Sequence, residues 1–301
     1  MTDAALITGL HHVTAFASDP LANVRFYTRS LGLRLVKRTV NFDDPTTYHL
    51  YYGDAVGSPG TLLTHFPQPR AARARHGTGE IAETILAGAR GSLGAWRRRL
   101  AEAGVEHTAG MIESLGVDGV TFADPDGMQL AIVEGDVPEG ALPVERAVLR
   151  VPDAAATLRF LADALGFVPA GSRGAHHDLA LGAGGVGQRL TVVHDSASPH
   201  EPMAAGTVHH IAWRVPDADA QRRAAERVRS AGVAVTPVMD RQYFRSIYFR
   251  IPGGIVFEIA TDGPGFDVDE SRESLGTALK LPPQYERRRE EISRQLVPLS
   301  T

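Results

Sequence analysis

The segment Gly9-Leu-His-His-Val-Thr-Ala-Phe16 decides the fold, because a near copy, Thr207-Val-His-His-Ile-Ala-Trp213, returns late in the chain. Each copy is a short apolar stretch with two adjacent histidines. An aspartate follows seven residues after the second histidine, at Asp19 and at Asp217. Because aspartate is a preferred helix N-cap, each copy predicts a strand that leads into a helix. A repeat of this kind indicates a fold built from copies of one small unit.

Two further segments, beginning at Glu80 and at Arg146, follow the same pattern, so the chain contains four similar units. In every unit a glycine just past the last apolar turn predicts the end of the helix. The strands that follow alternate between apolar and polar residues and are separated by turn residues, as is typical of antiparallel sheets. The sequence therefore predicts an α+β fold of four βαβββ modules that form two curved, mostly antiparallel sheets, or cups.

The four predicted modules cover approximately 8–67, 79–135, 143–195 and 206–262. We expect them to be grouped as two modules in 1–136 and two in 143–262. A polar C-terminal tail, 263–301, follows and contains a helix-like run from Gln284 to Ile292.

Composition excludes several classes of function. The net charge of −4 over 301 residues gives no basic field for nucleic acid. No apolar run approaches the ~20 residues needed to cross a bilayer, and the first residues lack the pattern of a secretory signal. The chain has no cysteine, which removes disulfides, thiolate nucleophiles and cysteine-based metal sites. We expect a cytoplasmic protein without nucleic-acid or membrane partners, and a homo-oligomer is compatible with this composition.

One histidine of each pair and one late glutamate form a candidate metal site. Adjacent residues on a strand point to opposite faces, so only one histidine of each pair is predicted to face a given cavity. His12 and His210 hold matching places in their modules, which puts His11 and His209 on the other face or at its margin. Glu258 lies in an otherwise apolar run, where an unpaired carboxylate would be strongly unfavourable. Two imidazoles and one carboxylate leave coordination positions open, an arrangement suited to Fe(II) and O₂.

The second and third modules provide an internal control. A single histidine on an apolar strand is more often a packed core residue than a ligand, so the hypothesis depends on the repeat. Arg146 stands where His12 and His210 stand in their modules, and Ala131 stands where Glu258 does. Modules two and three are therefore predicted to be metal-free.

Other histidines compete for a place at the site. His65 is close to the position in module one that the glutamate holds in module four, and it is a candidate extra ligand. Thr64 is the inward residue instead if the register differs by one. His49 and His107 are interpreted as surface or packing residues, and the pair His176-His177 as loop or surface.

These motifs resemble the vicinal-oxygen-chelate superfamily, which includes glyoxalases, extradiol dioxygenases and bleomycin-resistance proteins. More narrowly, the chain resembles ring-cleaving dioxygenases that act on hydroquinones. The resemblance spans almost the whole chain and is weakest in modules two and three. It rests on Leu10–Thr14, Leu35–Thr39, Tyr48–Tyr52, Gly57–Thr61, Val208–His210, Asp240–Tyr248, Pro252–Glu258 and Asp269–Gly276.

The resemblance implies Fe(II), with Mn(II) as an alternative, bound by His12, His210 and Glu258. It also implies catalytic residues that surround the metal and the substrate: His11, Thr14, His209, Arg241 and Tyr248. In this superfamily two modules form a cup around the metal. Ligands from modules one and four therefore predict that these two modules share the metal cup.

The implied activity is that of an extradiol-type ring-cleaving dioxygenase, with a small aromatic substrate of the hydroquinone or catechol type and O₂ as partners. Within it, His11 or His209 would move protons, Tyr248 would donate a hydrogen bond, and Arg241 would favour an anionic substrate group. Two other functions fit the sequence. A glyoxalase-like isomerase or lyase would use a metal with typically four protein ligands, which His65 would favour. A non-catalytic protein that binds aromatic ligands would need no metal.

Overall fold

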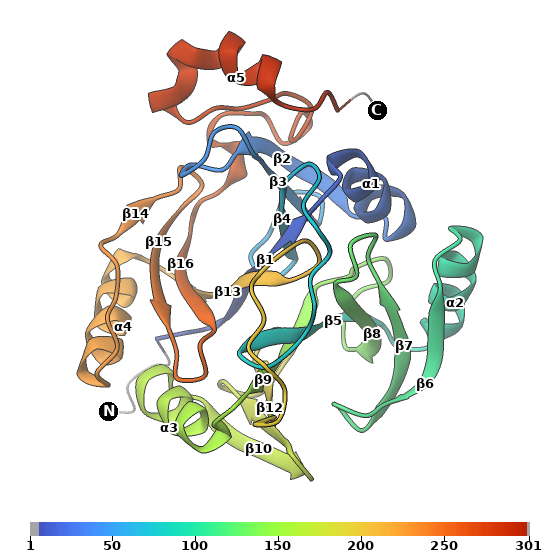
Figure 1. The fold of residues 1–301 in the computed structure, drawn as a ribbon, viewed down its shortest axis with the longest axis vertical. Coiled ribbons are helices and arrows are strands. Elements are labelled where there is room, and N and C mark those ends of the chain that lie inside the picture. The colour runs from blue at the N-terminus through green and yellow to red at the C-terminus, as the bar shows by residue number, and fades with distance from the viewer. Residues whose placement is uncertain (1–5, 300–301) are drawn as a thin grey trace.

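The structure is a computed structural model that describes residues 6–299. Two eight-stranded sheets form its centre, and the helices lie at the periphery (Figure 1). One sheet combines the strands of modules one and four, and the other combines those of modules two and three. The predicted α+β fold with two curved, mostly antiparallel sheets is confirmed, as is the sharing of one sheet by modules one and four.

The strands of the first sheet are, in spatial order, β14 (Met239–Asp240), β15 (Phe244–Arg250), β16 (Val256–Pro264), β13 (Val208–Val215), β1 (Gly9–Ala17), β4 (Leu62–Pro67), β3 (Tyr48–Gly53) and β2 (Arg34–Val40). Those of the second are β10 (Val168–Arg173), β11 (His176–Ala180), β12 (Arg189–His194), β9 (Val144–Val151), β5 (Glu80–Ala89), β8 (Gln129–Gly135), β7 (Val117–Ala123) and β6 (His107–Ile112). In each sheet the first strands of two modules pair antiparallel at the centre, β1 with β13 and β5 with β9.

Each module also contributes a helix after its first strand. The helices are α1 (Pro20–Arg25), which continues as the π-helix η1 (Phe26–Ser30), α2 (Leu93–Glu102), α3 (Ala154–Leu165) and α4 (Ala218–Ser230). Asp19, Asp153 and Asp217 accept hydrogen bonds from backbone N–H groups in the first turns of α1, α3 and α4. The N-caps predicted at Asp19 and Asp217 are thus confirmed, and Asp153 is the equivalent cap in module three. None of the helices described is long and apolar enough to span a membrane.

Three strands did not follow from the sequence pattern, namely β6, β10 and β14. All three lie at sheet edges, and the residues of β10 are almost all exposed. An edge strand without a buried face has no apolar alternation to reveal it. The interpretation of His176-His177 as loop or surface is wrong, because both residues begin β11 and are half-buried.

The C-terminal tail begins with a strap, residues 265–281, that crosses the edge strand β2. Lys37 on β2 is fully buried, and its Nζ lies 2.6 Å from Asp269 Oδ1 and 2.5 Å from Glu270 Oε2 in the strap. Gly276 has a φ of +76°, and a Cβ there would come within 1.9 Å of the Leu35 carbonyl oxygen, so this crossing requires glycine. The strap thereby connects β16 to β2 at the other end of the sheet. The tail contains η2 (Phe266–Val268), η3 (Pro283–Arg288) and α5 (Arg289–Gln295).

Candidate metal centre

Three predicted residues converge at the centre of the first sheet. His12 on β1 pairs with Ala212 on β13, and Ala212 pairs in turn with Glu258 on β16. His210 lies two residues before Ala212 and therefore on the same face of the strand. His12 Nε2 lies 3.2 Å from His210 Nε2 and 3.3 Å from Glu258 Oε2. His210 Nε2 lies 2.9 Å from Glu258 Oε2, so the three side chains present their ligand atoms to one another.

The other two histidines occupy β-bulges. The register between β1 and β13 shifts at His11 and again at His209, so each is an extra residue without a partner directly opposite. A bulge interrupts the alternation of side chains along a strand. His209 therefore lines the same cavity as His210, and the His11 ring lies 4.9 Å from the Phe244 ring, beside His12. The expectation that both residues lie on the other face or at its margin is therefore wrong for His209, whereas His11 lines a separate cavity of about 190 Å³.

Each bulged histidine orients the ring of its neighbour. His11 Nδ1 lies 2.9 Å from His12 Nδ1, and His209 Nδ1 lies 2.6 Å from His210 Nδ1. With Nδ1 engaged, each inner imidazole directs its Nε2 toward Glu258. Hydrogen bonds of this kind fix the tautomer and the orientation of metal-binding histidines.

Burial controls the charges at this centre. Desolvation, together with the charge of the adjacent histidine, lowers the pKa of His11 to about 3 and that of His209 to about 3. Burial also lowers the pKa of His210. Burial alone would raise the pKa of Glu258, but the neighbouring His12 and His210 hold it well below its usual range. A carboxylate that stays ionised is the protonation state that binds a divalent cation.

A divalent cation fits an unsatisfied atom at this point. Glu258 is fully buried, and its Oε1 accepts a hydrogen bond from Ser246. Its Oε2, which faces both imidazoles, has no hydrogen-bond partner within residues 6–299. Leaving a buried charged oxygen unpaired is costly. In the same part of the chain, only His12, His210 and Glu258 form a group of at least three potential ligands whose atoms all lie within 4.8 Å of one another.

His12 and His210 open onto a cavity of about 450 Å³, a volume typical of small-molecule sites. Its lining is mostly aromatic and apolar and includes Phe16, Phe42, Tyr51, Phe66, Met239, Phe244, Tyr248 and Val256. A larger surface cleft of about 910 Å³ lies beside α2 and contains none of the candidate residues. The smaller cavity is therefore the chemically relevant one, and its walls suit a flat aromatic ring.

Arg241 and Tyr248 line this cavity, as the resemblance implied. Arg241 Nε donates a hydrogen bond to the Tyr248 hydroxyl at 3.1 Å, and the guanidinium lies 5.3 Å from the centre of the Tyr248 ring. The other edge of the guanidinium pairs with Asp43, on the connection between β2 and β3, at 3.0 Å. This ion pair joins the two ends of the first sheet beside the cavity.

His49 on β3 is buried and packs against Tyr51 and Phe66, as the packing alternative predicted, and it also lines the cavity, which was not predicted. Its Nδ1 lies 2.9 Å from the Tyr51 hydroxyl, and its Nε2 lies 2.9 Å from Thr64 Oγ1. Thr64 Oγ1 lies 2.8 Å from Thr14 Oγ1, so Thr14 is linked to this wall through Thr64. The spacing of His49 and Tyr51, two residues apart on a strand, is the sequence signal that could have placed both on one face.

His65 lies on the opposite face of β4 from the metal centre. Thr64 pairs with Thr14 and is the inward residue, which was the alternative reading of the register. The His65 ring packs 4.3 Å from the Tyr27 ring, and its Nε2 lies 4.0 Å from Asp124 Oδ2. The expectation that His65 is a candidate extra ligand is therefore wrong.

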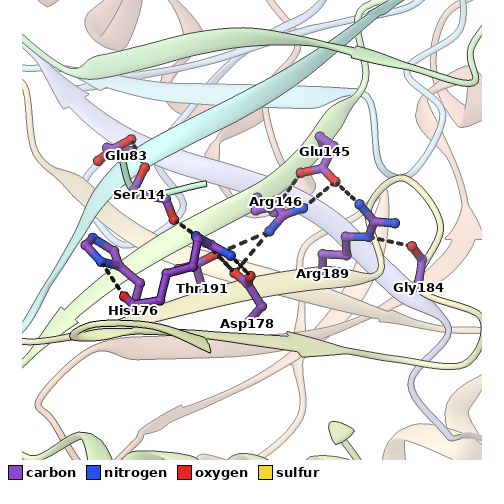
Figure 2. Close-up of polar contacts among 10 residues, drawn as sticks. Glu83, Ser114, Glu145, Arg146, His176, Asp178, Gly184, Arg189 and Thr191 are labelled. Carbon is purple, nitrogen blue, oxygen red and sulfur yellow. Dashed lines mark hydrogen bonds and ion pairs between the residues drawn. The ribbon is translucent and has the colours of Figure 1, made fainter. Parts of the chain in front are cut away.

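The second sheet carries ion pairs at the equivalent places. β5 and β9 show the same pattern of register shifts as β1 and β13, which puts Glu83 and Arg146 where the inner histidines stand. Arg146 Nε lies 2.5 Å from Glu145 Oε2, and Arg146 Nη1 lies 3.3 Å from Asp178 Oδ1 (Figure 2). Arg173 pairs with the other oxygen of Asp178 at 2.5 Å. Arg146 is thus held by fixed opposite charges in this cup, whereas Glu83 accepts a hydrogen bond from Ser114.

Comparison with known proteins agrees with this arrangement. Residues 9–132 and 144–259 match the Glyoxalase/Bleomycin resistance protein/Dioxygenase superfamily. The chain is 41% identical over 309 residues to a Bacillus subtilis protein provisionally named ring-cleaving dioxygenase MhqO, with 96% of both chains covered. It is 34% identical over 313 residues to the chlorohydroquinone/hydroquinone 1,2-dioxygenase of Sphingobium indicum, again with 96% of both covered.

Solved structures show the same fold. The crystal structure of a Bacillus subtilis protein, provisionally described as a dioxygenase, matches with a TM-score of 0.91 and 39% identity over 98% of each chain. Maize glyoxalase I, at 14% identity and a TM-score of 0.64, shares the fold over 84% of this chain and 92% of its own. The full-length relatives support a dioxygenase. The chain belongs to the glyoxalase/bleomycin resistance protein/dioxygenase superfamily.

Proposed function

We propose that this protein is an Fe(II)-dependent, extradiol-type dioxygenase that cleaves a hydroquinone-type or catechol-type ring. One observation carries the proposal: His12, His210 and Glu258 converge beside an aromatic-walled cavity, and the carboxylate oxygen that faces both imidazoles makes no hydrogen bond among the described residues. The full-length relatives named as ring-cleaving dioxygenases support the same reaction.

His12, His210 and Glu258 would hold the metal, and Mn(II) is the alternative ion. When bound, such a metal supplies a place where a substrate oxygen and O₂ meet and through which charge passes between them. The cavity walls would bind the ring, exclude water and position the substituents of the ring.

Two side chains are suited to stabilise negative charge on the substrate. The Tyr248 hydroxyl accepts a hydrogen bond from Arg241, which leaves its own hydrogen to donate to a substrate oxygen. Arg241, whose side chain is 16% exposed, adds a positive charge close to that oxygen. His209 lines the cavity beside His210 and, with its Nδ1 engaged by His210, presents Nε2 to the substrate, whereas His11 lies against Phe244.

The ligand set favours this function over a glyoxalase-like isomerase. Such an enzyme typically uses four protein ligands, and within residues 6–299 three converge. His65 faces away from them, and both ring nitrogens of His49 are engaged with hydroxyl groups. A purely ligand-binding protein would not need a buried ionised carboxylate between two imidazoles.

The test is purification under anaerobic conditions, followed by metal analysis and oxygen-electrode measurements with hydroquinones and catechols. We expect bound iron, O₂ uptake with at least one ring class, and an open-chain acid as the product. Binding of an aromatic ring by iron-loaded protein without O₂ uptake would contradict the proposal and favour a binding protein.

A further inference from the structure

Tyr51 and His49 form one wall of the cavity, and neither residue belongs to the metal triad. Both side chains lie on β3, which is separated from β1 by β4 alone. Since neighbouring strands lie ~4.8 Å apart, the β3 backbone is roughly 10 Å from that of β1. The Phe244 ring lines the cavity beside both, 5.3 Å from the His12 ring and 6.5 Å from the Tyr51 ring. This wall is therefore about the length of one substituted aromatic ring away from the triad.

Within this wall, hydrogen-bonding capacity remains at Tyr51. Both nitrogens of His49 are engaged, Nδ1 with the Tyr51 hydroxyl and Nε2 with Thr64 Oγ1. A phenolic hydroxyl has one hydrogen and two lone pairs, and the contact with His49 uses one of these. If Tyr51 donates to His49, a lone pair stays available, and if Tyr51 accepts, its hydrogen stays available. Burial raises the pKa of Tyr51 well above its usual value, so the hydroxyl keeps its proton.

The geometry of a benzene ring determines which oxygen can reach that hydroxyl. Two ortho oxygens point the same way, so a ring with one oxygen at the triad directs an ortho oxygen back toward the triad. Two para oxygens point in opposite directions, so a para oxygen is directed across the cavity. On the same lining Phe16, Phe66 and Phe244 offer an oxygen no partner, and the side-chain oxygens of Asn41, Asp43 and Thr236 already accept hydrogen bonds from the Asp43 N–H, Arg241 and the Tyr248 N–H.

We propose that Tyr51 hydrogen-bonds the substrate oxygen para to the one at the triad, and that His49 is the positioning residue that holds Tyr51 in place. This inference rests on the proposed function and narrows it, because the cavity then selects hydroquinone-type rings over catechol-type rings. The bonded chain from His49 through Thr64 to Thr14 fixes the imidazole against the sheet, so the hydroxyl is aimed before substrate binds.

The experiment measures binding to the iron-loaded enzyme without oxygen, by titration calorimetry with hydroquinone, catechol and phenol. Tyr51→Phe is expected to weaken hydroquinone binding roughly 3- to 10-fold, the effect of one lost neutral hydrogen bond. Binding of catechol and phenol should change less than twofold. Tyr52→Phe is the matched control, because Tyr52 follows on the same strand but its hydroxyl bonds Asn23 on the opposite face. It should leave all three affinities unchanged.

Variants of His49 test the positioning role. His49→Phe should lower the preference for hydroquinone over phenol by the same factor as Tyr51→Phe, and the double variant should lose no more than either single variant. His49→Asn, whose amide matches the place of Nδ1, should retain the preference. If Tyr51→Phe weakens binding of all three ligands equally, or of none, the inference is overturned. The proposed function still stands in that case, provided that the wild-type enzyme consumes O₂. Absence of O₂ uptake by the iron-loaded wild type with either ring class is the separate result that removes the proposed function.

Discussion

Lys37→Met is expected to destabilise the fold more than any exposed ion-pair substitution, because it leaves charge buried beneath the strap. The Lys37 side chain is fully buried, and so is that of Glu270, 1% exposed, whose Oε2 it contacts. Without Lys37, Asp269 would keep its hydrogen bonds from Gln242 and Tyr243. Glu270 would not be compensated in this way. Its Oε1 has no hydrogen-bond partner among the described residues, and its Oε2 would keep only a long contact, 3.4 Å, to the Gly276 N–H. Removing one partner of a buried ion pair costs ~3–5 kcal/mol, and we expect a loss of that size.

Urea unfolding followed by circular dichroism measures this loss, with the double variant Lys37→Met/Glu270→Gln as the matched comparison. The double variant no longer buries an unpaired charge and should recover more than half of the lost free energy of unfolding. The strap also contributes Phe266, whose ring lies 5.1 Å from that of Tyr51, so hydroquinone binding should weaken in the single variant as well. A loss below ~1 kcal/mol for Lys37→Met would refute this reasoning, because exposed pairs are worth that little.

Two further outcomes follow from the charges. Burial, and to a smaller extent the charge of Asp126, raises the pKa of Asp124 from 3.8 to about 6. Between pH 3.8 and pH 6 the folded state therefore keeps a proton on Asp124 that the unfolded chain has released. Wild type should therefore lose ~2.4 kcal/mol relative to Asp124→Asn as the pH rises from 4 to 7, as measured by urea unfolding at each pH; a pH-independent difference would contradict the assignment. Arg241→Lys removes the hydrogen bond from Arg241 Nε to the Tyr248 hydroxyl, 3.1 Å, and should lower kcat/KM about tenfold, equivalent to ~1.4 kcal/mol. The free energy of unfolding should change by less than ~1 kcal/mol, because the ion-pair partner Asp43 is 62% exposed. Steady-state kinetics beside thermal melts separate these effects, and unchanged kcat/KM would remove Arg241 from the site.

The sequence predicted the architecture well because the repeat itself encodes it. Matching places in the modules identified His12 and His210 as equivalent, and the helix caps at Asp19, Asp153 and Asp217 marked the ends of the first strands. If His12 and His210 bind one metal, their strands must be neighbours, which predicted that modules one and four lie together. The strand order of the first sheet agrees with this prediction.

The parts that sequence reasoning missed depend on register and on contacts between distant segments. A bulge adds one residue without any change in composition, so strict alternation misplaced His209. The same uncertainty of one residue left His65 and Thr64 unresolved. The contacts of His49 with Thr64 and of Lys37 with Glu270 could not be predicted, because each joins two distant segments of the chain.

The most direct test of the central claim is the iron content of reconstituted ligand variants. His12→Ala, His210→Ala and Glu258→Ala should each lose most of their iron, as measured by plasma emission spectrometry after anaerobic reconstitution and desalting. Glu83 holds the place in the second cup that corresponds to His12. Glu83→Ala should therefore retain the iron content of the wild type, and it is the control for losses caused by misfolding or by the reconstitution procedure. His11→Ala should keep iron and lose rate. Wild-type iron in any of the three ligand variants would contradict the proposed site.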